Sequence, residues 1–175
     1  MNLGIKMARG KYLYFLNSDD SFFDSDVLDQ VHTYLAKHSK LDWAFGNIHE
    51  TDGINTIGYP PLRRIFKGSH PTLLKFYNYI PHQATFVKKS VFDKFGYFDE
   101  NLSSMMDPEY WLRISNETNW DYMPVVVANY LIRPDSQSEN KNNLQKNTIE
   151  YEMVQSKYLS KLELVLAKLI NKLLR

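Results

Sequence analysis

The sequence contains no cysteine, and this absence removes several classes of functional site at once. Without cysteine there can be no disulfide framework, no thiolate zinc site and no cysteine nucleophile. A metal ion would have to be held by oxygen or imidazole ligands. The pattern suits a reducing compartment.

An excess of charge of one sign is also lacking. The 175 residues include 21 Lys and Arg against 20 Asp and Glu, which gives a formal net charge of +1 at pH 7. Nonspecific binding to nucleic acid depends on a strongly basic surface. The composition therefore predicts that nucleic acid is not a partner.

Long apolar runs are missing as well. The longest, at residues 12–16 and 125–132, fall well short of the roughly 18 to 20 residues that span a bilayer. The first residues also lack the apolar segment and cleavage site of a secretory signal. These absences predict a cytoplasmic protein, either free or at the inner face of the membrane.

The residues that are present suit one α/β domain. Hydrophobic residues make up 43% of the chain, which is enough for a single core. Apolar runs predict strands at 11–16, 42–48 and 82–87 and a final strand pair at 120–129 and 130–133. Helical spacing predicts helices at 2–9, 25–37, 73–79, 89–95 and 109–117. The alternation predicts a mixed sheet flanked by helices, with room for an antiparallel strand.

An acidic turn, Asn17-Ser18-Asp19-Asp20, follows the first predicted strand. Open α/β sheets bind ligands in the crevice outside the carboxyl ends of their strands. The two carboxylates are hard oxygen ligands, which suit Mg²⁺ or Mn²⁺. The alternative is that this turn caps the following helix, and the residue types alone support both interpretations equally.

The segment MNLGIKMARGKYLYFLNSDD, residues 1–20, resembles the family 2 glycosyltransferases with the GT-A fold. In that family a small helix, Ala-Arg-Gly, an aliphatic strand and an acidic Asp-x-Asp motif follow one another. The resemblance implies that Asp19 binds a divalent metal, Mn²⁺ or Mg²⁺, that bridges the phosphates of a nucleotide-sugar. It also implies donor contacts by Asn17, Asp19 and Asp20. Asn17 stands where the family usually has its first aspartate, which removes one negative charge.

Residues 81–92, 95–100 and 107–113 look like the acceptor half of the same family. The resemblance implies that Asp107 is the catalytic base of an inverting transfer, with Glu109 as the alternative position. A carboxylate beside an acceptor hydroxyl can take its proton as the oxygen attacks. The rival interpretation is that Asp107 is an N-cap, with Pro108 opening the helix.

Further site residues are expected from the same resemblance. It implies acceptor contacts by His82, Gln83, Glu109 and Trp111, with Arg113 lying under the site and pairing with a carboxylate. From the residue types alone, a structural role explains His82 better than a functional one, and Trp111 suits a core position better than a sugar platform. Arg63 and Arg64, in a long predicted loop, either approach phosphates or lie on a solvated face.

The resemblance covers about residues 1–138 and predicts a division of the chain. Residues 1–140 are expected to form the carboxyl-terminal part of a GT-A catalytic domain that lacks its first strands. Residues 141–175 are expected to form a polar linker and one amphipathic helix over 148–175, which packs on the domain or on a partner, or lies on a membrane surface. Because the first strands of the domain are expected to be missing, we expect residues 1–175 alone to self-associate or to be poorly active.

The expected function is metal-dependent transfer of a sugar from a nucleotide-diphosphate sugar to a hydroxyl of a glycan or lipid-linked acceptor. One alternative is a catalytically inactive remnant, or interaction module, that retains only the acceptor half. Another is a metal-dependent phosphohydrolase that uses Asp19 and Asp20. Resemblance supplies most of the first expectation.

Overall fold

Six strands in the described residues form one mixed sheet. The structure, a computed structural model, describes residues 1–53, 56–58, 69–132 and 143–173. The strand order is β1-β5-β3-β6-β2, and β4 pairs with β3 alone. The strands are β1 (Tyr12–Leu13), β2 (Ser21–Phe22), β3 (Trp43–Thr51), β4 (Thr56–Gly58), β5 (Thr85–Lys88) and β6 (Trp120–Leu131). Since β3 and β6 are parallel and the other pairs antiparallel, the predicted mixed sheet is confirmed.

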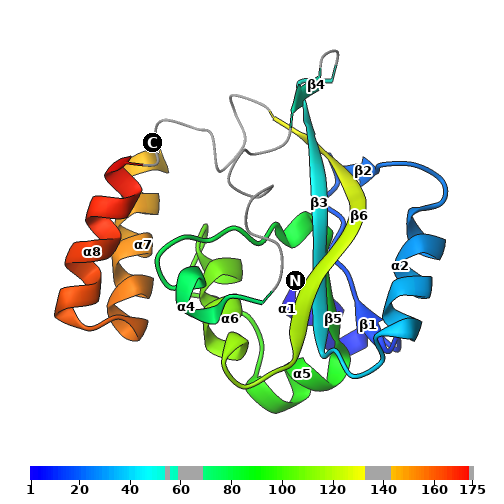
Figure 1. The fold of residues 1–175 in the computed structure, drawn as a ribbon, viewed down its shortest axis with the longest axis horizontal. Coiled ribbons are helices and arrows are strands. Elements are labelled where there is room, and N and C mark those ends of the chain that lie inside the picture. Colours follow the sequence, from blue (N-terminus) through cyan, green and yellow to red (C-terminus); the bar gives the residue numbers. More distant parts are fainter. Residues whose placement is uncertain (54–55, 59–68, 133–142, 174–175) are drawn as a thin grey trace.

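Helices cover both faces of this sheet. They are α1 (Asn2–Met7), α2 (Val27–Lys37), α4 (Pro71–Leu74), the 3-10 helix η1 (His82–Ala84), α5 (Lys89–Phe95), α6 (Met106–Ser115), α7 (Leu144–Tyr158) and α8 (Lys161–Leu173). Figure 1 shows α2 alone on one face, α5 and α6 on the other, and the α7–α8 pair beyond α6. The carboxyl-terminal helices therefore lie on the α6 side of the molecule.

Alternation along β3 divides the core between the two faces. Trp43 and Phe45 belong to the cluster under α5 and α6, whereas Ala44 and Ile48 belong to the cluster under α2. Successive side chains of a strand point to opposite faces, so both faces of this central strand are buried.

A register shift lets β3 and β6 approach closely. While β3 advances from Phe45 to Asn47, β6 advances from Tyr122 to Val126. Pro124 lies in this bulge, where a strand tolerates a residue without an N–H. Opposite it, a Cβ on Gly46 would lie 2.5 Å from the Val125 carbonyl oxygen, so glycine is required there.

Local signals predicted the longer elements better than the short ones. The helix at 89–95 is confirmed to the residue, and Gly96 ends it at a φ of +82°. The strand predicted at 11–16 shrinks to two residues, and β2 and β4 were missed because each has only two or three. Most of the loop predicted at 59–71 lies outside the described residues.

The single carboxyl-terminal helix predicted over 148–175 is wrong. The chain forms α7 and α8, separated at Leu159 and Ser160. The Ser160 N–H donates to Glu163 Oε2 at 2.8 Å, and the Glu163 N–H donates to Ser160 Oγ at 3.4 Å. This reciprocal pair is a capping box, which starts a new helix.

The two carboxyl-terminal helices differ in burial. Val154 and Gln155 of α7 are buried, which agrees with the expectation that this segment packs on the domain. The α8 helix leaves apolar side chains more than two fifths exposed: Leu162, Val165, Leu166 and Leu169. Every helix in the described part of the chain is too short or too polar to span a bilayer.

Candidate functional site

The acidic turn after β1 is held together by its own side chains. The Asp20 N–H donates to the Asn17 carbonyl at 3.2 Å, and Asn17 Nδ2 donates to Asp20 Oδ2 at 3.0 Å. The other Asp20 oxygen accepts from the Leu131 N–H, at the end of β6, at 3.4 Å. Both oxygens of Asp20 therefore have protein partners, while the neighbouring Asp19 is only partly buried.

Burial raises the pKa of the Asp20 carboxyl above its ordinary value. Hydrogen bonds from Leu131 and Asn17 act in the opposite direction, and the like charge of Asp19 adds to the rise. A third carboxylate at position 17 would repel the other two, whereas the Asn17 amide donates a hydrogen bond to one of them. Asn17 is thus compatible with this turn on physical grounds.

The turn does not cap the helix that follows it. Helix α2 begins at Val27 with Asp26 in the N-cap position, well beyond Asp20. The capping interpretation of the acidic turn is therefore wrong. A Mg²⁺ or Mn²⁺ ion can be held by one or two carboxylates when phosphate oxygens and water complete its shell.

The described residues offer few ligands for such an ion. Among them, no three His, Asp or Glu side chains are grouped so as to hold a metal by themselves. The acidic turn offers two carboxylates, Asp19 and Asp20, and each oxygen of Asp20 also accepts a hydrogen bond from the protein. This donor set fits an ion shared with a diphosphate.

His82 connects the acidic turn to α6. Asn17 Nδ2 lies 3.2 Å from His82 Nε2, and His82 Nδ1 lies 3.5 Å from Asp107 Oδ2. Because the amide nitrogen can only donate, Nε2 accepts and the imidazole proton belongs on Nδ1, facing Asp107. Three residues far apart in the sequence thus form one continuous polar chain.

Asp107 lies in the first turn of α6, one residue inside the helix. The N-cap is Met105, and no side chain caps this end through a local hydrogen bond. The prediction that Asp107 is the N-cap is therefore wrong. Its carboxylate is 19% exposed and lies beside His82 instead.

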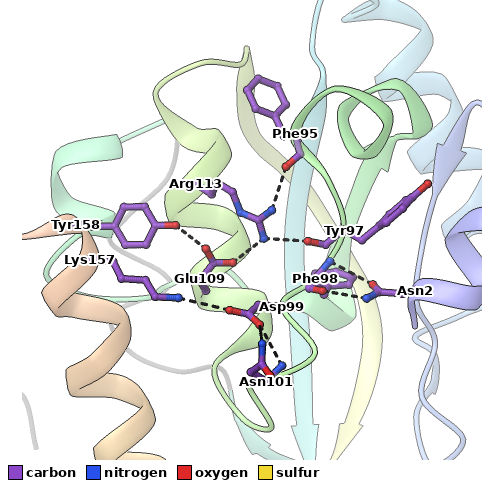
Figure 2. Close-up of polar contacts among 10 residues, drawn as sticks. All are labelled: Asn2, Phe95, Tyr97, Phe98, Asp99, Asn101, Glu109, Arg113, Lys157 and Tyr158. Atoms are coloured by element: carbon purple, nitrogen blue, oxygen red, sulfur yellow. Dashed lines mark hydrogen bonds and ion pairs between the residues drawn. The ribbon is translucent and has the colours of Figure 1, made fainter.

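Glu109 is placed inside the protein and not at the surface of the site. Its side chain is 6% exposed, and it accepts hydrogen bonds from Arg113 at 2.7 Å and from the Tyr158 hydroxyl at 2.5 Å. Figure 2 shows this group between α6 and α7, with Arg113 also donating to the Phe95 and Tyr97 carbonyls. The predicted pairing of Arg113 with a carboxylate is present. The predicted acceptor contact by Glu109 needs correction, since its side chain is buried and both of its oxygens accept hydrogen bonds within the protein.

Trp111 and Gln83 are also buried. Trp111 is 2% exposed and stacks on Trp43 with ring centroids 5.3 Å apart, so its ring belongs to the core. The predicted acceptor contact by Trp111 needs the same correction. Gln83 is 8% exposed, and its backbone carbonyl accepts from the Tyr14 hydroxyl at 2.8 Å. Arg63 and Arg64 lie outside the described residues.

Some residues around the site had not been predicted. Tyr14 ties the segment before the acidic turn to η1, and its ring stacks on Phe86 at 4.6 Å. From α7, Glu150 contacts Ser104 just before α6, and Tyr158 contacts Glu109 within it. No short sequence pattern marks these contacts, because each joins segments more than 45 residues apart.

The fold, a mixed sheet with an acidic turn after β1 and a carboxylate in the first turn of α6, can be compared with solved structures. Staphylococcus aureus TarS 1–349, solved in complex with UDP-GlcNAc, superposes with a TM-score of 0.68 over 93% of this chain and 48% of that one, at 14% identity. A second structure of Staphylococcus aureus TarS gives a TM-score of 0.64 over 93% of this chain and 28% of that one, also at 14% identity. The fold is therefore GT-A.

Sequence relatives carry the identification further, although no protein-family model matches the chain. A PGL/p-HBAD biosynthesis glycosyltransferase of Mycobacterium bovis is 30% identical over 133 residues, 74% of this chain and 48% of that protein. An uncharacterized glycosyltransferase of Methanocaldococcus jannaschii is 26% identical over 134 residues, 75% of this chain and 45% of that protein. The chain is thus homologous to glycosyltransferases, and it spans about half the length of these relatives.

Proposed function

We propose that this chain takes part in the transfer of a sugar from a nucleotide-diphosphate sugar to a hydroxyl of a glycan or lipid-linked acceptor. The observation that carries the proposal is the chain of contacts from Asn17 through His82 to Asp107. It joins the two segments that a transferase would need, one for the donor phosphates and one for the acceptor hydroxyl. Homology to glycosyltransferases and the UDP-GlcNAc complex of TarS support the class of donor.

On the acceptor side, Asp107 would act as the general base. Its carboxylate takes the proton of the acceptor hydroxyl while that oxygen bonds to the anomeric carbon. The bond from the anomeric carbon to the nucleoside diphosphate breaks, and the leaving group keeps the electron pair. Attack from the face opposite the leaving group inverts the anomeric centre. The Nδ1–H of His82 would orient the carboxylate.

On the donor side, Asp19 would hold the divalent ion, Mn²⁺ or Mg²⁺. Bound there, the ion would neutralise charge on the departing diphosphate. Asn17 and Asp20 would shape the turn around the donor, since their side chains bond to each other. If Asp19 holds the ion, removing its charge should weaken donor binding as well as turnover.

An inactive remnant is the alternative favoured by a specific observation. Among the described residues no three His, Asp or Glu side chains are grouped to hold a metal, so the donor side offers few ligands. A remnant would keep the fold of the acceptor half but bind no donor. Isothermal titration of a UDP-sugar with Mn²⁺ separates the two, because the proposal requires metal-dependent binding that Asp19→Asn abolishes.

The proposed base is tested by nucleotide release from a panel of UDP-, GDP- and dTDP-sugars, with and without alkyl-glycoside or polyprenyl-linked acceptors. The wild-type chain is compared with Asp107→Asn and with Asp93→Asn, which alters an exposed carboxylate paired with Lys89. We expect slow, acceptor-dependent release that falls about 100- to 10,000-fold in Asp107→Asn and is unchanged in the control. Acceptor-dependent release that survives in Asp107→Asn contradicts the assignment, and release that needs no acceptor indicates a phosphohydrolase.

A further inference from the structure

Glu150 of α7 is a buried carboxylate surrounded by donors from one short segment. It is 6% exposed. It accepts from the Ser103 N–H at 3.1 and 3.0 Å, the Ser103 hydroxyl at 2.6 Å, the Ser104 N–H at 2.8 Å and the Met105 N–H at 3.3 Å. Three successive backbone amides facing one anion make a strong, charge-assisted binding arrangement.

This segment leads directly into the helix that carries Asp107. Helix α6 has its N-cap at Met105 and no local side-chain cap. The first N–H groups of a helix have no partner within the helix and need one from elsewhere. Glu150, 45 residues beyond Met105, accepts from the Met105 N–H and so supplies a partner for one of these groups. Its negative charge is also favourable at the positive end of the α6 dipole.

A second contact from α7 holds α6 on the other side of Asp107. The Tyr158 hydroxyl donates to Glu109, which in turn pairs with Arg113 (Figure 2). Asp107 therefore lies between Met105 and Glu109, two residues that α7 holds directly. Lys157 adds an ion pair with Asp99 at 3.4 Å.

Hydrogen bonding keeps Glu150 charged in the folded protein. Burial acts to raise the pKa of this carboxyl, but the hydrogen bonds from Ser103, Ser104 and Met105 outweigh burial and leave the pKa below its ordinary value. A charged acceptor orders the three amides more strongly than a neutral one. The geometry and the charge state therefore act in the same direction.

We propose that Glu150 is a positioning residue for Asp107: by fixing residues 103–105 it sets where the carboxylate at the start of α6 lies relative to His82. This inference rests on the proposed function of Asp107 as a base. A base must lie within hydrogen-bond reach of the proton it takes, and a displacement of about 1 Å can lower the rate on the order of 100-fold. The α7 helix is then a structural part of the acceptor side.

The test compares Glu150→Gln with Glu152→Gln in the full chain. Glu152 lies on the same helix but is exposed and paired with Lys168, so it controls for the loss of a charge. In Glu150→Gln we expect amide hydrogen exchange at residues 103–109 to accelerate about tenfold or more, in line with the loss of one to two charge-assisted hydrogen bonds. We also expect the ¹⁵N signals of the His82 ring, which report its contact with Asp107, to shift. Neither should change in Glu152→Gln.

Catalysis supplies a readout that a purely structural role would not give. Glu150→Gln should lower kcat about tenfold while leaving the donor KM unchanged, and this loss should vanish when Asp107→Asn is already present. Unchanged His82 signals in a folded Glu150→Gln chain would overturn the inference, as would an equal loss of kcat in both backgrounds. If Glu150→Gln does not fold, Ser103→Ala, which removes one hydroxyl donor, is measured in the same way with the same criteria.

The two proposals fail separately. If the wild-type chain transfers no sugar to any acceptor, the proposed function is wrong. The exchange and His82 signals would still show whether Glu150 sets the position of Asp107. If transfer is present but those signals do not respond to Glu150→Gln, only the positioning inference is wrong.

Discussion

The two sides of the candidate site are built differently. The donor-side turn, residues 17–20, follows a two-residue edge strand and is held mainly by bonds among its own side chains and to Leu131. The acceptor-side helix α6 is held by contacts with distant elements: Glu150 of α7 accepts from the Met105 N–H at its start, and Arg113 on the helix donates to the Phe95 carbonyl. The comparison teaches that the proposed base is fixed by tertiary contacts, whereas the proposed metal ligand depends on a local turn.

The largest difference in stability should come from the buried pair of α6. Glu109→Ala leaves Arg113 and the Tyr158 hydroxyl without their shared carboxylate, and breaking a buried ion pair costs about 3–5 kcal/mol. Urea unfolding measures this change. Asp93→Ala breaks the exposed Lys89–Asp93 pair, which has the same i,i+4 spacing, and should change stability by less than about 0.5 kcal/mol. Equal effects of the two substitutions would contradict the contrast between buried and exposed contacts.

Acid should weaken the acceptor side through Glu150. Its folded-state pKa is lowered, so it contributes stability at pH values above its unfolded pKa and loses that contribution as pH falls through the folded pKa. We expect Glu150→Gln to be less stable than wild type at pH 7 by about 1–3 kcal/mol. The gap should narrow as pH falls below about 4.5, the ordinary value for a glutamate. Thermal unfolding across this range measures the gap, and a constant gap would argue against a charged Glu150.

The donor-side turn should give the smallest change in stability. Asn17→Ala removes the bonds to Asp20 and His82, but these groups are only partly buried, so we expect a loss of about 1 kcal/mol or less. The same substitution should raise the pKa of Asp20 further, because one of the hydrogen bonds that lowers it is lost. Carboxyl ¹³C titration by NMR measures that shift. A loss of stability as large as that of Glu109→Ala would remove the distinction between the two sides.

Sequence patterns predicted what local interactions decide. The helix at 89–95 was predicted to the residue because Gly96 ends it, and the break between α7 and α8 could have been found from the spacing of Ser160 and Glu163. The contacts of Glu150 and Tyr158 could not, because they join residues 45 to 49 positions apart. Tertiary packing decided those contacts.

For the candidate site, the family resemblance identified the segments but not the direction in which each side chain points. It placed Asn17, His82 and Asp107 in the candidate site, and these three do form one polar chain. It also included Trp111 as an acceptor contact, whereas the residue type had favoured the core position that the structure confirms, stacked on Trp43. A motif on a helix gives the order of residues, whereas the neighbouring sheet decides which of them face solvent. The catalytic and metal-binding roles stay predictions.

Paramagnetic NMR with Mn²⁺ and UDP tests most directly whether the two sides share one site. Mn²⁺ held by Asp19 should strongly broaden the signals of Asn17, His82 and Asp107, while Leu162 on α8 should keep its intensity. Mg²⁺ with UDP should broaden none of them, and Asp19→Asn should abolish the effect. Broadening that misses Asp107, or that persists in Asp19→Asn, would contradict the account.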